Sequence, residues 1–299
     1  MELTRREVLL AAAAVVPFAA RGDAQSAPSR LSVEGYIWQQ DAAARKRSLA
    51  DSLDEILGMA RATGFRNIEL NNGFFTPALR NRVLELLQSN GLSTPSVYVG
   101  GGMHQEALAE ATTKQALDIA RACKPLGCRA VVTNPNPKAG QEKTDAELTV
   151  QAAMLNQTGK ALAAEGYQLW VHNHTPEMVN GAREWWHTLN NTDPAYVWIC
   201  LDIDWVHQGD QDPLALLKAA GSRLASVHLR NSSEKMWLES LSDGDVDYRQ
   251  VAAILNSARL KPLLTVELAY RPQTAITRSL EENLRLSRAY AERIFGVMA

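Results

Sequence analysis

The sequence predicts an α/β protein folded as one (β/α)8 barrel. From about residue 28 onward, short β-rich runs alternate eight times with longer helical patterns, and no shift in composition divides the 299 residues into two domains. Single barrels of this class commonly reach about 250 residues, so one domain fits the length. An open, doubly wound sheet is the alternative. It is less favoured because no glycine-rich phosphate loop follows the first strand.

Composition and charge exclude several classes of protein. With 46% hydrophobic and 21% charged residues, the chain has the composition of an ordinary globular protein rather than of a disordered or collagen-like one. Its 31 Lys and Arg residues nearly balance 33 Asp and Glu residues, and no basic run occurs along the chain. We therefore expect neither nucleic acid nor an anionic membrane surface as the main partner.

The first 27 residues have the features of an export signal. Arg5 and Arg6 precede an apolar run from Val8 to Ala20, which is too short to span a hydrocarbon layer of ~30 Å. Paired arginines in this place are typical of the twin-arginine class. We expect a signal peptide over 1–27 that is recognised by the twin-arginine export machinery. The barrel of 28–299 would then be periplasmic or otherwise exported from a bacterium, with no membrane contact after cleavage. An uncleaved membrane anchor is the alternative.

Eight short runs are expected as barrel strands because they are rich in β-branched and aromatic residues. They are Leu31–Trp38, Arg66–Leu70, Thr94–Val99, Arg129–Thr133, Gln168–His172, Tyr196–Asp202, Arg223–Leu229 and Leu263–Leu268. Between them, apolar residues at three- and four-residue spacing predict helices, of which the clearest are Leu49–Thr63, Pro77–Ser89, Gln105–Lys124 and Asp145–Glu165. Each of these helices is followed by a glycine suited to a left-handed stop, namely Gly64, Gly91, Gly127 and Gly166.

Four consecutive strands, the fifth to the eighth, end in residues that can bind a metal ion. The endings are His172-Asn173-His174, Asp202-Ile203-Asp204, His228-Leu229-Arg230 and Glu267. Active sites of such barrels lie at the carboxyl ends of the strands, and two imidazoles with two carboxylates suit a divalent ion such as Mn, Co or Zn. Side chains of a strand alternate with period two, so His172 and His174 share a face, as do Asp202 and Asp204. We expect one of each pair as the inner ligand and the other as its neighbour at the rim.

Further candidates lie near the same end of the predicted barrel. His104 follows a run of three glycines after the third strand and is expected to reach the substrate. Trp38 closes strand one and Glu69 closes strand two, while Trp205 directly follows the Asp202–Asp204 segment. An aromatic wall beside polar groups suits the apolar face of a sugar ring, although Trp38 could instead cap the core. Glu177 is expected either as a second carboxylate of the site or as a partner that holds a histidine ring.

With these motifs the chain resembles the xylose isomerase-like TIM-barrel superfamily, which includes sugar phosphate isomerases and epimerases. The resemblance runs from about residue 31 to the C-terminus. Its most specific motifs are Val171-His172-Asn173-His174 with Glu177, Leu201-Asp202-Ile203-Asp204-Trp205, Val227-His228-Leu229-Arg230 and Thr265-Val266-Glu267. The resemblance implies one divalent metal ion, with manganese favoured and cobalt, zinc or magnesium as alternatives. Its ligands would be His172, Asp202, His228 and Glu267.

The chain departs from the superfamily pattern at two places. Epimerases of the superfamily usually have a glutamate where His172 stands, which leaves a proton relay between two glutamates in doubt. Their strand-seven motif usually continues with Lys-Asp, whereas here Arg230 keeps a cation and Asn231 loses a charge. Export and the absence of a phosphate-binding loop favour a small carbohydrate substrate that is not phosphorylated. The residues expected to contact it are Trp38, Glu69, His174, Trp205 and Arg230.

The leading hypothesis is a metal-dependent isomerase or epimerase. It would remove a proton next to the carbonyl of a carbohydrate through an enediolate, and Glu267, Glu177 or His104 would move the proton. If a leaving group is β to the carbonyl, the same enediolate expels it, so a lyase acting on 3-keto-glycosides is the close alternative. A glycosidase with a carboxylate pair and an exported sugar-binding barrel without turnover stay open. The sequence leaves the oligomeric state open, a homo-oligomer included.

Overall fold

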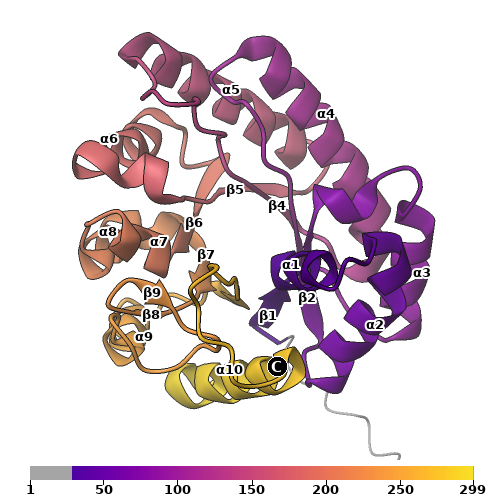
Figure 1. The fold of residues 1–299 in the computed structure, drawn as a ribbon. Helices are drawn as coiled ribbons and strands as arrows, with labels where there is room; N and C mark the ends of the chain where they lie inside the picture. Colours follow the sequence, from indigo (N-terminus) through magenta and orange to yellow (C-terminus); the bar gives the residue numbers. More distant parts are fainter. Residues whose placement is uncertain (1–28, 299) are drawn as a thin grey trace, which may run out of the picture.

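Eight parallel strands close into a barrel in the computed structural model, which describes residues 29–298 (Figure 1). Neighbouring strands follow the order β1-β10-β7-β6-β5-β4-β3-β2, which confirms the predicted (β/α)8 barrel and excludes the open sheet. The predicted signal peptide lies outside the described residues and stays a prediction. The barrel strands are β1 (Leu31–Glu34), β2 (Asn67–Asn71), β3 (Ser96–Tyr98), β4 (Ala130–Thr133), β5 (Gln168–Val171), β6 (Val197–Asp202), β7 (Leu224–Leu229) and β10 (Leu263–Val266).

Helices surround the barrel in chain order, as Figure 1 shows. They are α1 (Tyr36–Ala44), α2 (Leu49–Ala62), α3 (Arg80–Ser89), α4 (Glu106–Cys123), α5 (Asp145–Ala163), α6 (Thr175–Asn191), α7 (Ile203–Gln208), α8 (Pro213–Ala220), α9 (Tyr248–Ser257) and α10 (Leu280–Phe295), with short 3-10 turns η1 (Asn72–Phe75), η2 (Lys124–Leu126) and η3 (Gly221–Arg223). A small antiparallel hairpin, β8 (Ser232–Ser233) with β9 (Met236–Trp237), follows β7. No helix of the described residues is long and apolar enough to cross a membrane.

Local capping explains why several helices begin where they do. The Ser48 hydroxyl accepts a hydrogen bond from the backbone N–H of Asp51 and so caps α2. At the start of α5, Thr144 and Glu147 form a reciprocal capping box. These signals are present in the sequence, and the helices Leu49–Thr63 and Asp145–Glu165 agree with the structure within two residues.

The first β/α unit differs from the prediction. Strand β1 ends at Glu34 rather than at Trp38, and α1 begins at Tyr36. Gly35 lies between them, and its N–H donates to the carbonyl of Glu69 at 2.8 Å. A Cβ at Gly35 would lie 2.7 Å from the Leu70 side chain, so glycine permits this close approach of the turn to β2.

Two layers of core hold the barrel together. The larger one packs the outer faces of the strands against the helices, and it contains most of the buried aliphatic residues. A smaller one fills the barrel interior below the site with Ala130, Val132, Trp170, Cys200 and Leu263. The interior is therefore a packed core beneath the carboxyl ends of the strands.

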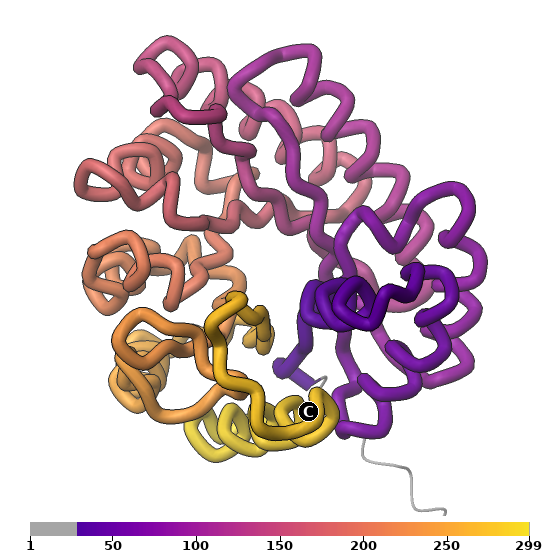
Figure 2. The backbone as a smooth tube through the Cα atoms, viewed as in Figure 1, coloured from indigo at the N-terminus to yellow at the C-terminus, as the bar shows by residue number. Residues whose placement is uncertain are grey.

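The first and last strands meet in this barrel. Strand β1 pairs with β10 in parallel register, with Val33 opposite Val266. Figure 2 shows the consequence, because the indigo and yellow ends of the chain lie side by side. Residues near position 34 and residues near position 267 are thus neighbours at the mouth of the barrel.

Candidate active site

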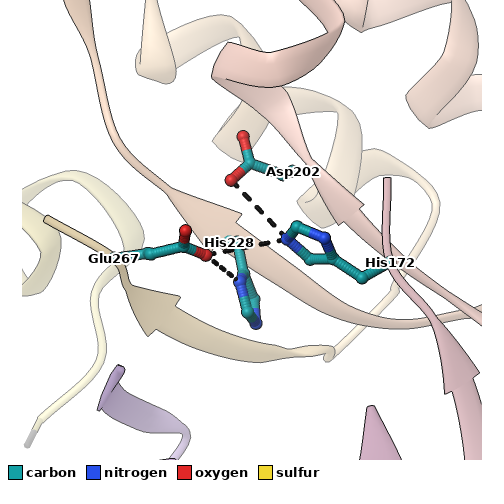
Figure 3. A group of neighbouring side chains, drawn as sticks. All are labelled: His172, Asp202, His228 and Glu267. Atoms are coloured by element: carbon teal, nitrogen blue, oxygen red, sulfur yellow. Dashed lines mark hydrogen bonds and ion pairs between the residues drawn. The ribbon is translucent and has the colours of Figure 1, made fainter. Parts of the chain in front are cut away.

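Four predicted ligands meet at the carboxyl end of the barrel (Figure 3). His172 follows β5, Asp202 ends β6, His228 lies on β7 and Glu267 follows β10. All four side chains are buried, and one nitrogen or oxygen of each lies within 4.8 Å of the others. Of the two alternatives that period-two alternation left open, the structure places His172 and Asp202 in this group.

Distances within the group indicate a shared binding point. His172 Nε2 lies 3.7 Å from Asp202 Oδ2 and 3.6 Å from Glu267 Oε2, while His228 Nδ1 lies 2.5 Å from the same Glu267 oxygen. The Nε2 atom of His172 is buried and has no hydrogen bond within the described residues. A buried nitrogen without a partner is uncommon in a folded protein, and a metal ion between the carboxylates would satisfy it.

Buried carboxylates also favour a cation at this place. Asp202 and Glu267 are accompanied by two more buried acidic side chains, those of Glu69 and Asp204. Within the described residues, Arg230 is the one Lys or Arg that an ion pair joins to these four. An excess of buried carboxyl groups over Lys and Arg favours a bound cation, and mixed imidazole and carboxylate donors suit a divalent transition metal. The residues present therefore fit a divalent metal ion.

Glu69 supports a histidine instead of reaching the cavity where substrate was expected. Its side chain is fully buried, and Oε1 lies 3.1 Å from His228 Nε2. The other oxygen accepts a hydrogen bond from the Ser96 hydroxyl. His228 therefore turns Nε2 toward Glu69 and Nδ1 toward Glu267 Oε2, so Nδ1 is the nitrogen that would reach a metal ion in this group. The substrate contact predicted for Glu69 is thus corrected to a role beneath the site.

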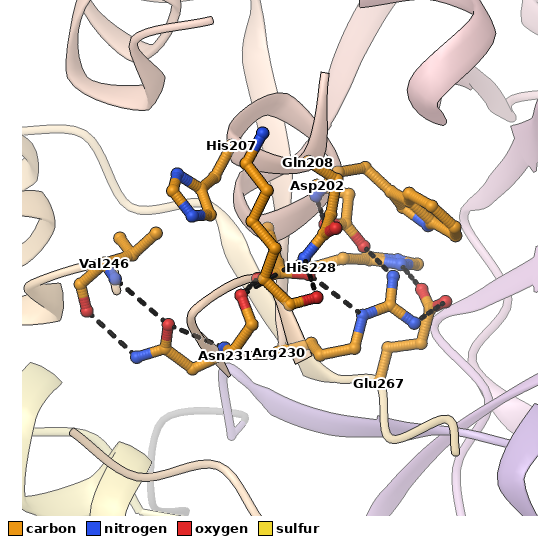
Figure 4. A network of polar contacts seen from close by, with 12 residues as sticks. Asp202, His207, Gln208, His228, Arg230, Asn231, Val246 and Glu267 are labelled. Atoms are coloured by element: carbon orange, nitrogen blue, oxygen red, sulfur yellow. Dashed lines mark hydrogen bonds and ion pairs between the residues drawn. The ribbon is translucent and has the colours of Figure 1, made fainter. Parts of the chain in front are cut away.

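The guanidinium group of Arg230 is hydrogen-bonded to Asp202 and Glu267, so it is not free to bind substrate. Its guanidinium is buried, and it donates to Asp202 Oδ2 at 3.1 Å and to Glu267 Oε1 at 3.3 Å (Figure 4). The guanidinium carbon also lies 4.9 Å from the ring centre of Trp205 and 4.3 Å from that of Trp237. Arg230 therefore holds the carboxylates of two candidate ligands in place, although its side chain still lines the cavity.

A cavity of about 410 Å³ has one residue of this group, Glu267, in its lining. Four of its lining residues were predicted, namely His174, Trp205, Arg230 and Glu267. Six others were not predicted from the sequence, namely Glu34, Tyr36, Asn71, Tyr98, Trp237 and Ala269. Glu34 and Tyr36 were missed because the first strand was predicted to continue to Trp38, which placed both residues inside the strand instead of at its carboxyl end. Tyr98 ends β3, so its position at the carboxyl end of a strand could have marked it. Nothing in the sequence marks the hairpin that carries Trp237.

Glu177 and His104 do not line this cavity. Glu177 is buried and accepts a hydrogen bond from the backbone N–H of His174 at 2.7 Å, so it fixes the segment that carries His174. Burial, together with the charge of Glu184, raises the pKa of Glu177 to about 7. His104 is also buried, and its ring lies 3.2 Å from the side-chain amide of Gln105. Both were expected to move a proton, and their placement corrects that expectation.

Trp38 is likewise corrected. It lies on α1 rather than at a strand end, is 1% exposed and donates its indole N–H to Met59 Sδ at 3.3 Å. Its alternative role as a core residue is the one that its burial supports. The aromatic wall of the cavity is instead made by Tyr36, Tyr98, Trp205 and Trp237.

The titratable groups that line the cavity are shifted in opposite directions. Burial and the charges of Glu267 and Glu69 raise the pKa of Glu34 well above its ordinary value. Burial would raise that of Glu267 too, but Arg230 and the two ligand histidines outweigh it and hold the Glu267 pKa well below its usual range. Burial and the charge of His172 lower the pKa of His174 to about 3, so its imidazole is neutral at physiological pH.

Comparison with known proteins gives a consistent result. A family model described as xylose isomerase-like TIM barrel matches residues 57–290. A protein named inosose dehydratase from Salmonella typhimurium is 27% identical over 148 residues, which cover 44% of this chain and 49% of that protein, so the chain spans about half the length of this relative. A protein of the same name from Lactiplantibacillus plantarum is 24% identical over 253 residues, or 75% of this chain and 84% of that protein.

Solved structures share the fold. An L-ribulose 3-epimerase superposes with a TM-score of 0.72 at 15% identity, covering 89% of this chain and 94% of that one. A sugar phosphate isomerase/epimerase from Parabacteroides distasonis superposes with a TM-score of 0.69 at 17% identity, covering 93% and 98%. At such low identity these likenesses establish the barrel architecture and nothing about activity.

Proposed function

The chain belongs to the xylose isomerase-like TIM barrel family, and from this membership and its site we propose that it is a divalent-metal-dependent isomerase or epimerase of an unphosphorylated carbohydrate. The observation that carries the proposal is the buried group of His172, Asp202, His228 and Glu267, of which Glu267 also lines an aromatic-walled cavity. A divalent ion held by these four residues would act as a Lewis acid that polarises a substrate carbonyl and acidifies the neighbouring C–H.

The protein's own groups support proton removal at that carbon. Of the three residues expected to move a proton, Glu267 is the one that lines the cavity. Arg230 and His228 keep its carboxylate ionised and oriented, so it can accept the proton. Return of the proton to the neighbouring carbon gives an isomer, and return to the opposite face of the same carbon gives an epimer.

The cavity lining favours a neutral sugar. Among the described lining residues Arg230 is the sole Lys or Arg, and its terminal nitrogens are bound to Asp202 and Glu267. No cation of this lining is therefore available for a phosphate group, whereas Tyr36, Trp205 and Trp237 offer flat apolar surfaces to a sugar ring. These contacts support an unphosphorylated carbohydrate as substrate.

A lyase activity is the second candidate. It is favoured by the names of the curated relatives, inosose dehydratase, because dehydration also begins with removal of a proton next to a carbonyl. The same initial step followed by loss of a β-oxygen would cleave a 3-keto-glycoside or dehydrate a keto-cyclitol. Product analysis separates this outcome from isomerisation and epimerisation.

The test is metal content measured beside turnover. Plasma mass spectrometry of the mature chain, purified without chelator, should find about one equivalent of a divalent transition metal. His228→Ala should lose the ion and lower turnover of keto-sugars at least about 100-fold, since the ion supplies several kcal/mol of transition-state stabilisation. His187→Ala, a substitution on the outer helix α6, is the matched control and should change neither.

Two outcomes would contradict the proposal. Unchanged activity in His228→Ala would exclude the metal mechanism. Absence of metal from both proteins would favour a sugar-binding barrel or a glycosidase with a carboxylate pair. If the metal result is as expected, a panel of L-ribulose, D-allulose, inosose and 3-keto-glycosides distinguishes the isomerase or epimerase from the lyase.

A further inference from the structure

Glu34 is a carboxylate at the cavity that the proposed reaction has not yet used. It ends β1, which pairs with β10, and it lines the cavity together with Glu267. These two are the carboxylates among the described lining residues. They line the cavity from the neighbouring strands β1 and β10.

The two carboxylates differ in how their oxygens are engaged. Glu267 uses both oxygens, because Oε2 faces His228 Nδ1 and Oε1 accepts from Arg230. Glu34 uses one, since Oε2 accepts the backbone N–H of Tyr36 at 2.5 Å. Within the described residues its Oε1 has no hydrogen-bond partner. The Tyr36 contact thus fixes the carboxyl group and leaves one oxygen available to a ligand in the cavity.

We infer that Glu34 is a catalytic residue that performs the second proton transfer of the proposed reaction. The inference rests on the proposed function, which needs one group to take a proton and another to give one back. Glu34 is suited to the second role because it is anchored on one oxygen and borders the cavity beside Glu267.

Two proton transfers make up the reaction, and each conserves atoms and electrons. Glu267 takes the proton from the carbon next to the carbonyl, and the C–H electron pair forms the C=C bond of an enediolate while the carbonyl electron pair moves onto oxygen. Glu34 then gives its carboxyl proton to carbon, the C=C electron pair forms the new C–H bond, the electron pair on oxygen re-forms the carbonyl, and Glu34 becomes a carboxylate. In the lyase variant the proton goes instead to the departing β-oxygen as its C–O bond breaks. Glu267 and Glu34 return to their starting states by exchanging protons with water.

The position of Glu34 agrees with this division of labour. Burial is the largest cause that raises its pKa. A buried carboxyl group that borders a cavity and is held through one oxygen is suited to give a proton.

The experiment separates the two proton transfers. Wild type, Glu34→Gln and the control Glu110→Gln, whose side chain is exposed on α4, are incubated in D2O with L-ribulose, D-allulose and inosose. NMR then follows replacement of the C–H next to the carbonyl by C–D, and chromatography follows product. We expect Glu34→Gln to keep its metal ion and its hydrogen exchange while product formation falls about 100-fold or more, the usual contribution of a general acid. Glu110→Gln should match wild type.

A second variant guards against misfolding. Glutamine keeps an oxygen that can accept the Tyr36 N–H, and Glu34→Asp keeps the carboxyl group while shortening its reach. Glu34→Asp is expected to recover part of the product rate lost in Glu34→Gln.

Product formation by Glu34→Gln within about threefold of wild type would overturn the inference. So would loss of hydrogen exchange together with product while the metal stays bound, because Glu34 would then act before the second transfer. Failure of metal-loaded wild type to exchange hydrogen or form product on any probe would instead contradict the proposed function.

Discussion

Single buried side chains determine how this protein responds to pH. Glu177 is 3% exposed, and one of its oxygens, Oε1, has no hydrogen-bond partner within the described residues. Its pKa is raised from 4.5 to about 7, with burial as the largest cause. A carboxyl group with a raised pKa in the folded state stays protonated there while the unfolded chain ionises. Its contribution to stability is therefore present below about pH 4.5 and is lost as pH rises to about 7.

Substituting Glu177 by glutamine should remove this loss. Glutamine cannot ionise, and its side-chain oxygen can still accept the His174 N–H. Between pH 4.5 and 7.5 the free energy of unfolding of Glu177→Gln should rise relative to wild type by up to about 3 kcal/mol, measured by urea unfolding at each pH. The control Glu110→Gln should run parallel to wild type. Parallel curves for Glu177→Gln as well would show that the carboxyl group titrates normally.

At the scale of elements, close contact between a helix and a neighbouring loop can require a residue that has a low helix propensity. Gly159 lies inside α5, where glycine is a poor helix former. A Cβ there would lie 2.4 Å from the carbonyl oxygen of Tyr196, in the loop that leads into β6. Glycine therefore allows α5 to pack against that loop, and the contact is with backbone that has little freedom to move.

Two glycine-to-alanine substitutions should have opposite signs. A methyl group added at Gly58 in α2 would meet no atom within 4 Å, so Gly58→Ala should raise the free energy of unfolding by about 0.5–1 kcal/mol through helix propensity. Gly159→Ala should lower it by about 1–3 kcal/mol, because the clash outweighs that gain. Denaturant titration checks both. Stabilisation by Gly159→Ala would mean that α5 and the loop before β6 can move apart.

At the scale of the whole molecule, the site links distant parts of the chain. The four candidate ligands come from β5, β6, β7 and β10, whereas Glu34, Tyr36 and Asn71 reach the cavity from the first two β/α units. Closure of the barrel by β1 and β10 brings these parts together. An ion bound to this group should therefore stabilise the folded barrel as a unit, since the unfolded chain does not assemble the ligands.

Removal of metal should accordingly lower the melting temperature. At an ion concentration about 100 times Kd, binding contributes about 2.7 kcal/mol, which corresponds to roughly 5–10 °C for a domain of this size. Calorimetry of chelator-treated wild type with and without added Mn²⁺ measures the shift, and His228→Ala should show none. An equal melting temperature for wild type with and without the ion would argue against a site in this group.

The sequence alone determined the barrel and the four strand ends that carry the candidate ligands, because both depend on local periodicity. Alternation of strand and helix patterns predicts eight β/α units, and parallel strands place their carboxyl ends together, so the residues at those ends can be grouped from their positions in the chain. Chain position finds His228 and Glu267 in this way and leaves the choice between His172 and His174, and between Asp202 and Asp204, open. The resemblance to the superfamily implies His172 and Asp202, and the structure places these two in the group.

Only the tertiary structure decided what surrounds the ligands. Glu34 reaches the cavity beside Glu267 through a strand pairing between the two ends of the chain, and Trp237 comes from a hairpin that no local pattern marks. Arg230 binds the carboxylates of Asp202 and Glu267 instead of substrate, because oxygens of both lie within hydrogen-bonding distance of its guanidinium group. Distances between segments far apart in sequence, and the burial that strengthens charge interactions, arise only when the barrel closes.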